Sequence, residues 1–155
     1  MPDLPVPVPV FLARLEVTPG AVHDLGPTDV GHRRIIDLDG GTVVGERFRG
    51  TVLRGGADWQ AVLADGTTTV DTRYVVHTDD DALVHVRATG MQAGPPHVLE
   101  ALARGEEVDP SSYRFRTAMT FETGDVRYRW LTRVLTVCTV ARRPGRVVID
   151  AYTVT

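Results

Sequence analysis

Residues 59–89 read WQAVLADGTTTVDTRYVVHTDDDALVHVRAT, and this stretch decides the fold class. Three runs rich in valine, threonine and aromatic residues are separated by Asp65-Gly66 and by Asp79-Asp80-Asp81. An Asp-Gly pair between two such runs is a strong hairpin signal, because it accepts the positive φ angles of a tight turn. The pattern predicts three antiparallel strands: Trp59–Leu63, Thr67–Thr78 and Ala82–Thr89.

Similar runs recur on both sides of this stretch. They predict five more strands: Phe11–Val17, Val43–Leu53, Tyr113–Glu122, Val126–Ala141 and Val147–Val154. One helix is expected at residues 96–104, because Pro95-Pro96 precede it and Gly105 follows it, which are typical helix boundaries. About eight strands joined by tight turns predict a single all-β domain over residues 1–155. It would be an antiparallel barrel or sandwich with the short helix near one end.

The composition excludes several classes of function. The chain has 155 residues, with 43% hydrophobic and 24% charged, which is ordinary for one globular domain. The net charge of −3 gives no reason to expect nucleic acid or an anionic membrane as a partner. All 17 basic residues are arginine, so Schiff-base catalysis and a lysine general base are excluded.

The single cysteine and the first residues bear on the compartment. Cys138 has no second cysteine to pair with and lies in an apolar β-branched run, so we expect a buried structural thiol. Residues 1–17 have neither a basic start nor an uninterrupted apolar run, so no signal peptide is expected. No apolar run approaches the roughly 20 residues that span a bilayer. We therefore expect a soluble, cytoplasmic protein.

The stretch Gly45–Gln60, GERFRGTVLRGGADWQ, predicts the lip of a pocket. Gly55-Gly56 lets the backbone pass close to another surface, and a carboxylate (Asp58) and an indole (Trp59) follow directly. Asp58 is the predicted proton-transferring group, because a neighbouring indole would shield it from water and desolvation raises a carboxyl pKa.

Three further side chains are predicted to take part in catalysis. Asp71 is the reserve for proton transfer, although Arg73 on the same strand face is its expected partner. Arg47, Arg116 or a tyrosine would hold a developing oxyanion.

An aromatic strand face predicts the ligand-binding surface. Alternate residues of a strand share a face, and in residues 113–141 one face is aromatic while the other is charged. In a small barrel such a face either fills the interior or lines a cavity for one small ligand, and both alternatives stay open. The predicted ligand-binding residues are Trp59, Tyr74, Tyr113, Phe115, Tyr128, Trp130 and Thr132.

Other kinds of site have little support. His77 and His85 flank the triple aspartate, but they face each other only for one loop length, so solvated histidines are expected and no metal. The only serines, Ser111-Ser112, lack a nucleophile elbow. The glycine pairs lack the spacing of a phosphate-binding loop, and we predict no cofactor.

Six stretches match one known family in its order: Gly45–Gly50, Gly55–Gln60, Asp71–Tyr74, Tyr113–Thr117, Phe121–Gly124 and Trp130–Arg133. On these stretches the chain resembles the bacterial and fungal family catalogued as domain of unknown function 3237. The resemblance implies a single antiparallel barrel of lipocalin-like appearance, a homodimer, and a small hydrophobic ligand of secondary metabolism, without naming a shared reaction.

Three positions depart from the family pattern. Arg54, Asp81 and Thr132 stand where the family has proline, glycine and asparagine respectively. The loss of the asparagine amide at Thr132 would alter a ligand site there.

The leading hypothesis is a barrel that binds a small hydrophobic or aromatic, polyketide-like molecule and catalyses a cyclisation or isomerisation. The alternative is a non-catalytic small-molecule binding protein. Neither version involves nucleic acid or a membrane.

Overall fold

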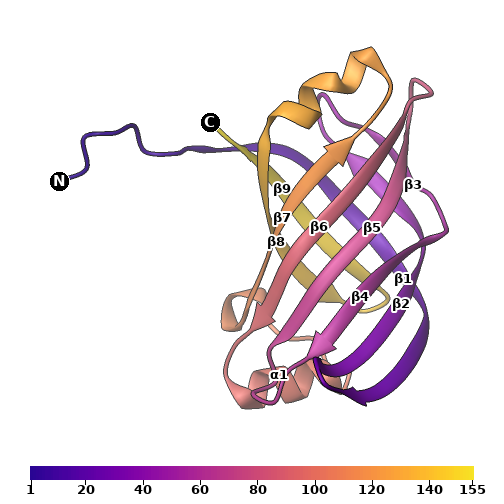
Figure 1. Ribbon diagram of the computed structural model, residues 1–155, viewed down its shortest axis with the longest axis vertical. Helices are drawn as coiled ribbons and strands as arrows, with labels where there is room; N and C mark the ends of the chain where they lie inside the picture. Colours follow the sequence, from indigo (N-terminus) through magenta and orange to yellow (C-terminus); the bar gives the residue numbers. More distant parts are fainter.

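Nine antiparallel strands close into a barrel in the computed structural model, which describes residues 1–155 (Figure 1). The sheet runs in the order β1-β9-β8-β7-β6-β5-β3-β2-β4, and the pairings β1–β2 and β5–β4 close the ring. The all-β barrel prediction is confirmed. The strands are β1 (Pro9–Thr28), β2 (Gly31–Val44), β3 (Gly50–Val52), β4 (Gly56–Val62), β5 (Thr68–Thr78), β6 (Leu83–Ala93), β7 (Arg114–Glu122), β8 (Leu135–Arg143) and β9 (Arg146–Val154).

Alternation of side chains builds the barrel wall. Along β7, Phe115, Thr117, Met119 and Phe121 are buried while every intervening residue is exposed. The predicted aromatic face of this strand is therefore correct. The neighbouring strand β8 pairs with β7 only from Arg116 to Met119, which leaves a short ladder between these two strands.

Two predicted strands have different bounds, because tertiary pairing overrides local breakers. The first strand, expected to stop at Val17, continues to Thr28 along β2, and register shifts on both sides of Pro19 absorb the proline. The strand expected at Val43–Leu53 is split into the end of β2 and the short β3. Between these two strands the side chain of Phe48 enters the core and is fully buried.

The predicted strand Val126–Ala141 is wrong in its first half. Residues Val126–Arg133 form a 3₁₀ helix, η2, and only the remainder belongs to β8. The Asp125 carboxylate accepts a hydrogen bond from the backbone N–H of Arg127 at 2.9 Å and so caps the start of η2. Strand alternation therefore does not apply to the aromatic residues of this segment.

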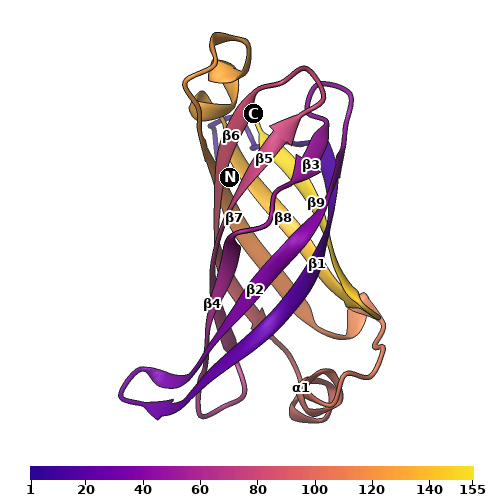
Figure 2. The same ribbon diagram turned by 90° about the vertical axis from the view of Figure 1, so that its right-hand side faces the viewer.

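The two ends of the barrel differ. The helix α1 (Pro96–Ala103) lies at one end, as predicted, and the short 3₁₀ helix η1 (Pro110–Ser112) follows it (Figure 2). At the opposite end, beside η2, Phe48 packs edge-on against Phe121 and Tyr128, with ring centroids 5.7 and 6.4 Å apart. This aromatic cluster fills the barrel at the η2 end. None of the helices is long and apolar enough to cross a membrane.

Candidate ligand-binding and catalytic site

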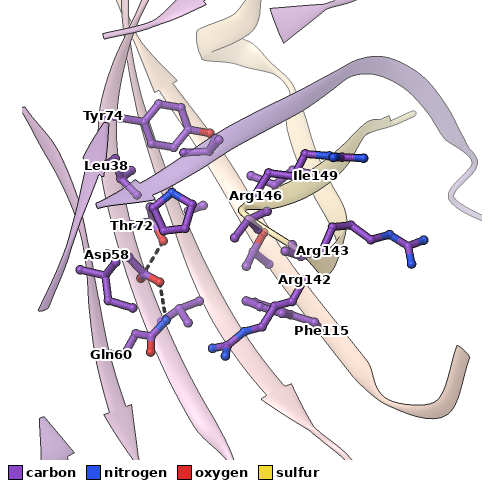
Figure 3. Close-up of a pocket in the computed structure, with 18 of the residues that line it drawn as sticks. Leu38, Asp58, Gln60, Thr72, Tyr74, Phe115, Arg142, Arg143, Arg146 and Ile149 are labelled. Atoms are coloured by element: carbon purple, nitrogen blue, oxygen red, sulfur yellow. Dashed lines mark hydrogen bonds between the residues drawn. The ribbon is translucent and has the colours of Figure 1, made fainter. Parts of the chain in front are cut away.

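A cavity of about 200 Å³ occupies the barrel interior beyond the aromatic cluster (Figure 3). Its mouth lies at the β8–β9 turn, where Arg143 pairs with Glu107 in the segment that follows α1. The wall is mainly apolar. Its apolar residues include Val17, Ile36, Leu38, Val70, Ala88, Phe115, Val140, Val147 and Ile149.

One carboxyl group, that of Asp58, projects into this cavity from β4. Its Oδ2 accepts a hydrogen bond from Gln60 Nε2 at 2.7 Å, and its Oδ1 accepts one from Thr72 Oγ1 at 2.9 Å (Figure 3). Burial raises the pKa of Asp58 above its ordinary value of 3.8, although the two hydrogen bonds and the charge of Arg142 oppose this shift. The carboxyl group can therefore keep a proton at a pH where an exposed aspartate has lost it.

Strand register brings the hydrogen-bonding partners of Asp58 next to it. On β5, Thr72 lies directly opposite Asp58, and on β2, Arg34 lies directly opposite Gln60. Arg34 Nη2 donates to Gln60 Oε1 at 2.9 Å, so a chain of hydrogen bonds runs from Arg34 through Gln60 and Asp58 to Thr72. Three neighbouring strands thus hold the carboxyl group in one orientation.

Two polar side chains of the cavity wall have no partner. The hydroxyl oxygens of Tyr74 and Thr117 are buried and make no hydrogen bond within the protein. Burial raises the pKa of Tyr74, so its phenol stays protonated and can donate. Because buried polar groups are nearly always hydrogen-bonded, these two oxygens mark positions where a polar atom of a bound molecule would fit.

The structure brings three of the predicted site residues to the cavity. Asp58, Tyr74 and Phe115 all line it. Tyr113 is buried beside it, and its hydroxyl oxygen accepts a hydrogen bond from the backbone N–H of Arg142 at 3.0 Å. The remaining predicted residues lie elsewhere.

The prediction that Trp59 lines the pocket is wrong. Successive strand residues point to opposite faces, so the inward direction of Asp58 sends Trp59 to the outer surface, where 46% of it is exposed. The barrel interior, and not the neighbouring indole, therefore removes water from Asp58.

Asp71 and Arg116 also lie on the outer surface. Asp71 accepts two hydrogen bonds from Arg87, both at 3.1 Å, and its expected partner Arg73 lies 3.6 Å away. Arg87 is the main cause that lowers the pKa of Asp71. Arg116 donates to its neighbour's backbone, the carbonyl of Phe115, at 3.0 Å. Neither predicted residue reaches the cavity.

The other four predicted residues gather at the η2 end. Tyr128 donates a hydrogen bond to Asp80 Oδ1 at 2.7 Å, and Thr132 donates one to the carbonyl of Arg129 at 2.7 Å. The Arg47 guanidinium stacks on Trp130, 3.8 Å from the ring centroid. The expected set is thus divided among the cavity, the outer surface and the η2 end, and Tyr128, Trp130 and Thr132 lie at the η2 end because η2 is not a strand.

Several cavity residues were missed, although a signal for some of them was present. Gln60 is two residues after Asp58, and Arg142 extends the inward series Thr136, Cys138, Val140 by one more step. Both follow from a period of two along the strand. The unusual choice of long polar residues at inward positions was the signal.

A match to one protein family extends over nearly the whole chain. Residues 5–154 match the family described as protein of unknown function (DUF3237). The chain belongs to this family. The predicted resemblance is confirmed, and two of the family's relatives are UPF0311 proteins of bacteria. One from Rhodopseudomonas palustris is 43% identical over 135 residues, covering 87% of this chain and 88% of that protein. One from Clostridium acetobutylicum is 39% identical over 123 residues, covering 79% and 78%.

Solved structures of similar proteins have the same fold. The crystal structure of a conserved protein of unknown function from Rhodopseudomonas palustris has a TM-score of 0.92 at 39% identity, covering 98% of this chain and 99% of that one. A β-barrel-like protein from Acinetobacter baumannii has a TM-score of 0.87 at 39% identity, and the match covers 100% of both chains.

A more distant relative is a fungal enzyme. The hydroalkoxylation enzyme phnH of Penicillium herquei is 28% identical over 124 residues, covering 80% of this chain and 68% of that enzyme. The crystal structure of an enzyme from the same fungus has a TM-score of 0.75 at 23% identity, covering 100% of both chains, which is a likeness of fold.

Substituting Trp59 tests the corrected position. We expect Trp59→Ala to stay folded and to lower the free energy of unfolding by about 2–3 kcal/mol, since 46% of the residue is already exposed. Affinity for an apolar probe such as naphthalene should not change, whereas Phe115→Ala should weaken it. Urea denaturation measures the change in stability, and probe titration measures the change in affinity. Loss of probe binding in Trp59→Ala would show that Trp59 contributes to the binding site.

Proposed function

We propose that this barrel binds a small, mainly apolar or aromatic, polyketide-like molecule and catalyses its cyclising isomerisation, with Asp58 as the proton-transferring group. The observation that carries the proposal is a single carboxyl group whose pKa burial raises, held by Gln60 and Thr72 inside an otherwise mainly apolar cavity. Such a group suits general acid–base catalysis, because it can keep a proton and deliver it in a water-poor space.

The distant fungal relative supports a reaction type. Hydroalkoxylation adds an O–H group across a carbon–carbon double bond. In our proposal, protonated Asp58 gives its proton to one alkene carbon, and the π bond breaks. The substrate hydroxyl oxygen then bonds to the other carbon and closes a ring, and the hydroxyl proton passes to the Asp58 carboxylate. Substrate and product are isomers, so no oxidant, reductant or cofactor is consumed.

The remaining cavity residues have binding roles in this proposal. Tyr74 and Thr117 supply the unpartnered hydroxyl groups that would hold an oxygen of the substrate. Thr72 and Gln60 fix the carboxyl orientation, and such positioning contributes to rate by holding the reacting atoms in line. Phe115 and the aliphatic wall would enclose the apolar body.

The test uses a simple substrate that carries both reacting groups, 2-(3-methylbut-2-enyl)phenol. We expect the protein to convert it to 2,2-dimethylchroman, followed by proton nuclear magnetic resonance. Ala88 lines the cavity from β6, so Ala88→Leu should block both binding and product formation. Ala118→Leu, on the exposed face of β7, is the matched control and should behave as the parent. Product formed at the parental rate in a folded Ala88→Leu variant would contradict a reaction inside the cavity.

The pH dependence of turnover should follow Asp58. A general acid acts only while protonated, so the rate should fall as pH rises through the pKa of Asp58, above the ordinary 3.8. The folded state also holds this proton more tightly than the unfolded chain does. Asp58 therefore lowers the free energy of unfolding progressively as pH rises from 3.8 through its raised pKa. A pH–rate profile measures the first effect, and a flat profile would contradict it.

The alternative function is non-catalytic binding of the same class of molecule. The two hydrogen bonds that Asp58 accepts favour it, because they already satisfy the carboxyl group without a substrate. In this case the cavity-blocking variant abolishes probe binding, and the parent forms no product from any substrate. The homodimer implied by the family resemblance stays a prediction, which sedimentation equilibrium tests.

A further inference from the structure

Two arginines of a cleft that adjoins the cavity make no ion pair with a carboxylate. Arg142 lines both the cavity and an adjoining open cleft of about 790 Å³, and Arg34 lines that cleft. Neither takes part in an ion pair, whereas the next residue in the chain, Arg143, pairs with Glu107 at 3.4 Å. In Figure 3 the Arg142 guanidinium extends toward the Gln60 side of the cavity, while that of Arg143 points away.

Both guanidinium groups are partly removed from water, and neither is bonded to a carboxylate. Arg34 Nε is buried and makes no hydrogen bond, and its only side-chain hydrogen bond is the one from Nη2 to Gln60. Burial lowers the pKa of Arg142, and the nearby charge of Arg34 lowers it further. A buried cation without a partner is costly, so two of them side by side need an explanation.

The acidic groups around the cleft form no ion pair with either arginine. Asp24 is hydrogen-bonded to His32 at 2.6 Å and is only near enough to Arg34 for that charge to lower the pKa of Asp24, while Asp65 accepts from the backbone N–H of Thr67 at 2.9 Å. Glu100 on α1 is exposed to solvent. Asp58 is near enough for its charge to raise the pKa of Arg142, but no ion pair or hydrogen bond joins the two side chains.

We propose that Arg34 and Arg142 bind a carboxylate of the ligand where the cleft adjoins the cavity, while the apolar body of the ligand lies in the cavity beside Asp58. This inference rests on the proposed function and adds a class to its substrate: an apolar or aromatic acid. A planar guanidinium fork matches the two oxygens of a carboxylate, and two forks from β2 and β8 would hold it from both sides. Gln60 joins Arg34 to Asp58, so the charged group and the proton-transferring group share one network.

This arrangement also couples binding to chemistry. Arg142 opposes the rise in the pKa of Asp58 in the free protein. A bound carboxylate would neutralise Arg142 and add a like charge near Asp58, and both changes favour the protonated carboxyl group. The charged end of the ligand would thus help to keep the proton on Asp58 until it is transferred.

The test compares two probes of the same shape, 2-naphthoate and its uncharged analogue 2-naphthamide, by isothermal titration calorimetry. We expect the parent to bind 2-naphthoate at least about tenfold more tightly, which corresponds to about 1.4 kcal/mol. Arg142→Gln and Arg34→Gln should each reduce this preference to about twofold or less without changing the affinity for 2-naphthamide. Arg143→Gln, which alters a cavity-mouth arginine that has a partner, should keep the preference.

Thermal unfolding separates a binding role from a structural one. Because Arg142 makes no ion pair and burial outweighs the charge of Asp58 in its effect on the pKa of Arg142, Arg142→Gln should not lower the unfolding temperature, whereas removal of a structural residue would lower it. Equal affinities of the parent for both probes would overturn the carboxylate site and leave the cavity-binding proposal standing. Equal losses in all three arginine variants would also overturn it, since a diffuse positive field would then explain the preference. Failure of both probes to bind the parent at millimolar concentration would overturn the proposed function together with this inference.

Discussion

Asp58→Asn should lower turnover at least about a hundredfold while leaving ligand affinity within a few-fold, because positioned acid–base catalysis typically contributes about 10²–10⁴ in rate. The asparagine keeps the shape of the side chain, so the cavity and its apolar contacts persist. It carries no acidic proton, so the step that needs one is lost. Single-turnover kinetics on 2-(3-methylbut-2-enyl)phenol, with separate titration of the same compound, measures the two quantities.

Asp71→Asn is the matched control for this substitution. Asp71 lies on the next strand, but its carboxylate binds Arg87 on the outer surface and has its pKa lowered by that pair. We expect its turnover to equal that of the parent. If Asp58→Asn and Asp71→Asn were equally active, Asp58 would have no part in proton transfer, and only shape-directed catalysis or binding would remain.

Phe48→Ala should lower the free energy of unfolding by about 3–5 kcal/mol. Phe48 is fully buried and contacts two aromatic rings, those of Phe121 and Tyr128, at the packed end of the barrel. Removing the ring leaves a cavity between the rings of Phe121 and Tyr128. The change is measured by urea denaturation, as a shift of the midpoint at constant slope.

A second phenylalanine provides the comparison. Phe11 also makes one aromatic pair, with Tyr152 at 5.8 Å, but it is 53% exposed. Phe11→Ala should therefore lower the free energy of unfolding by only about 1–2 kcal/mol, because only part of its area leaves water on folding. Equal losses in the two variants would show that the aromatic cluster contributes no more than a surface pair.

The fold could be predicted because its determinants are local. Asp65-Gly66 and the alternation along β5 and β7 specify turns and strand faces over a few residues each. In the turn after β5, Asp81 has a φ of 69°, a left-handed conformation that glycine adopts more readily than a residue with a side chain.

The site could be predicted only in part, because its parts meet through closure of the sheet. Asp58 and Trp59 are neighbours in sequence, yet alternation separates them across the wall. Arg34 and Arg142 are far apart in sequence, and only the ring of strands brings their charges together. The capped start of η2, which removed Tyr128 from the expected face, depends on one aspartate side chain rather than on hydrophobic periodicity.

The short ladder between β7 and β8 has a consequence for local opening of the barrel wall. With pairing confined to Arg116–Met119 on β7, this seam holds fewer backbone hydrogen bonds than the long ladder between β5 and β6. Apart from the three-residue ladders that hold β3, this is the shortest ladder of the ring. Local opening costs least where few such bonds must break, so the wall between the longer strands should open here before the rest of the sheet unfolds. A transient gap at this seam would admit water or a small molecule to the hollow half without displacing α1. The rate of ligand exchange and the rate of global unfolding would then be set by separate barriers in one small barrel.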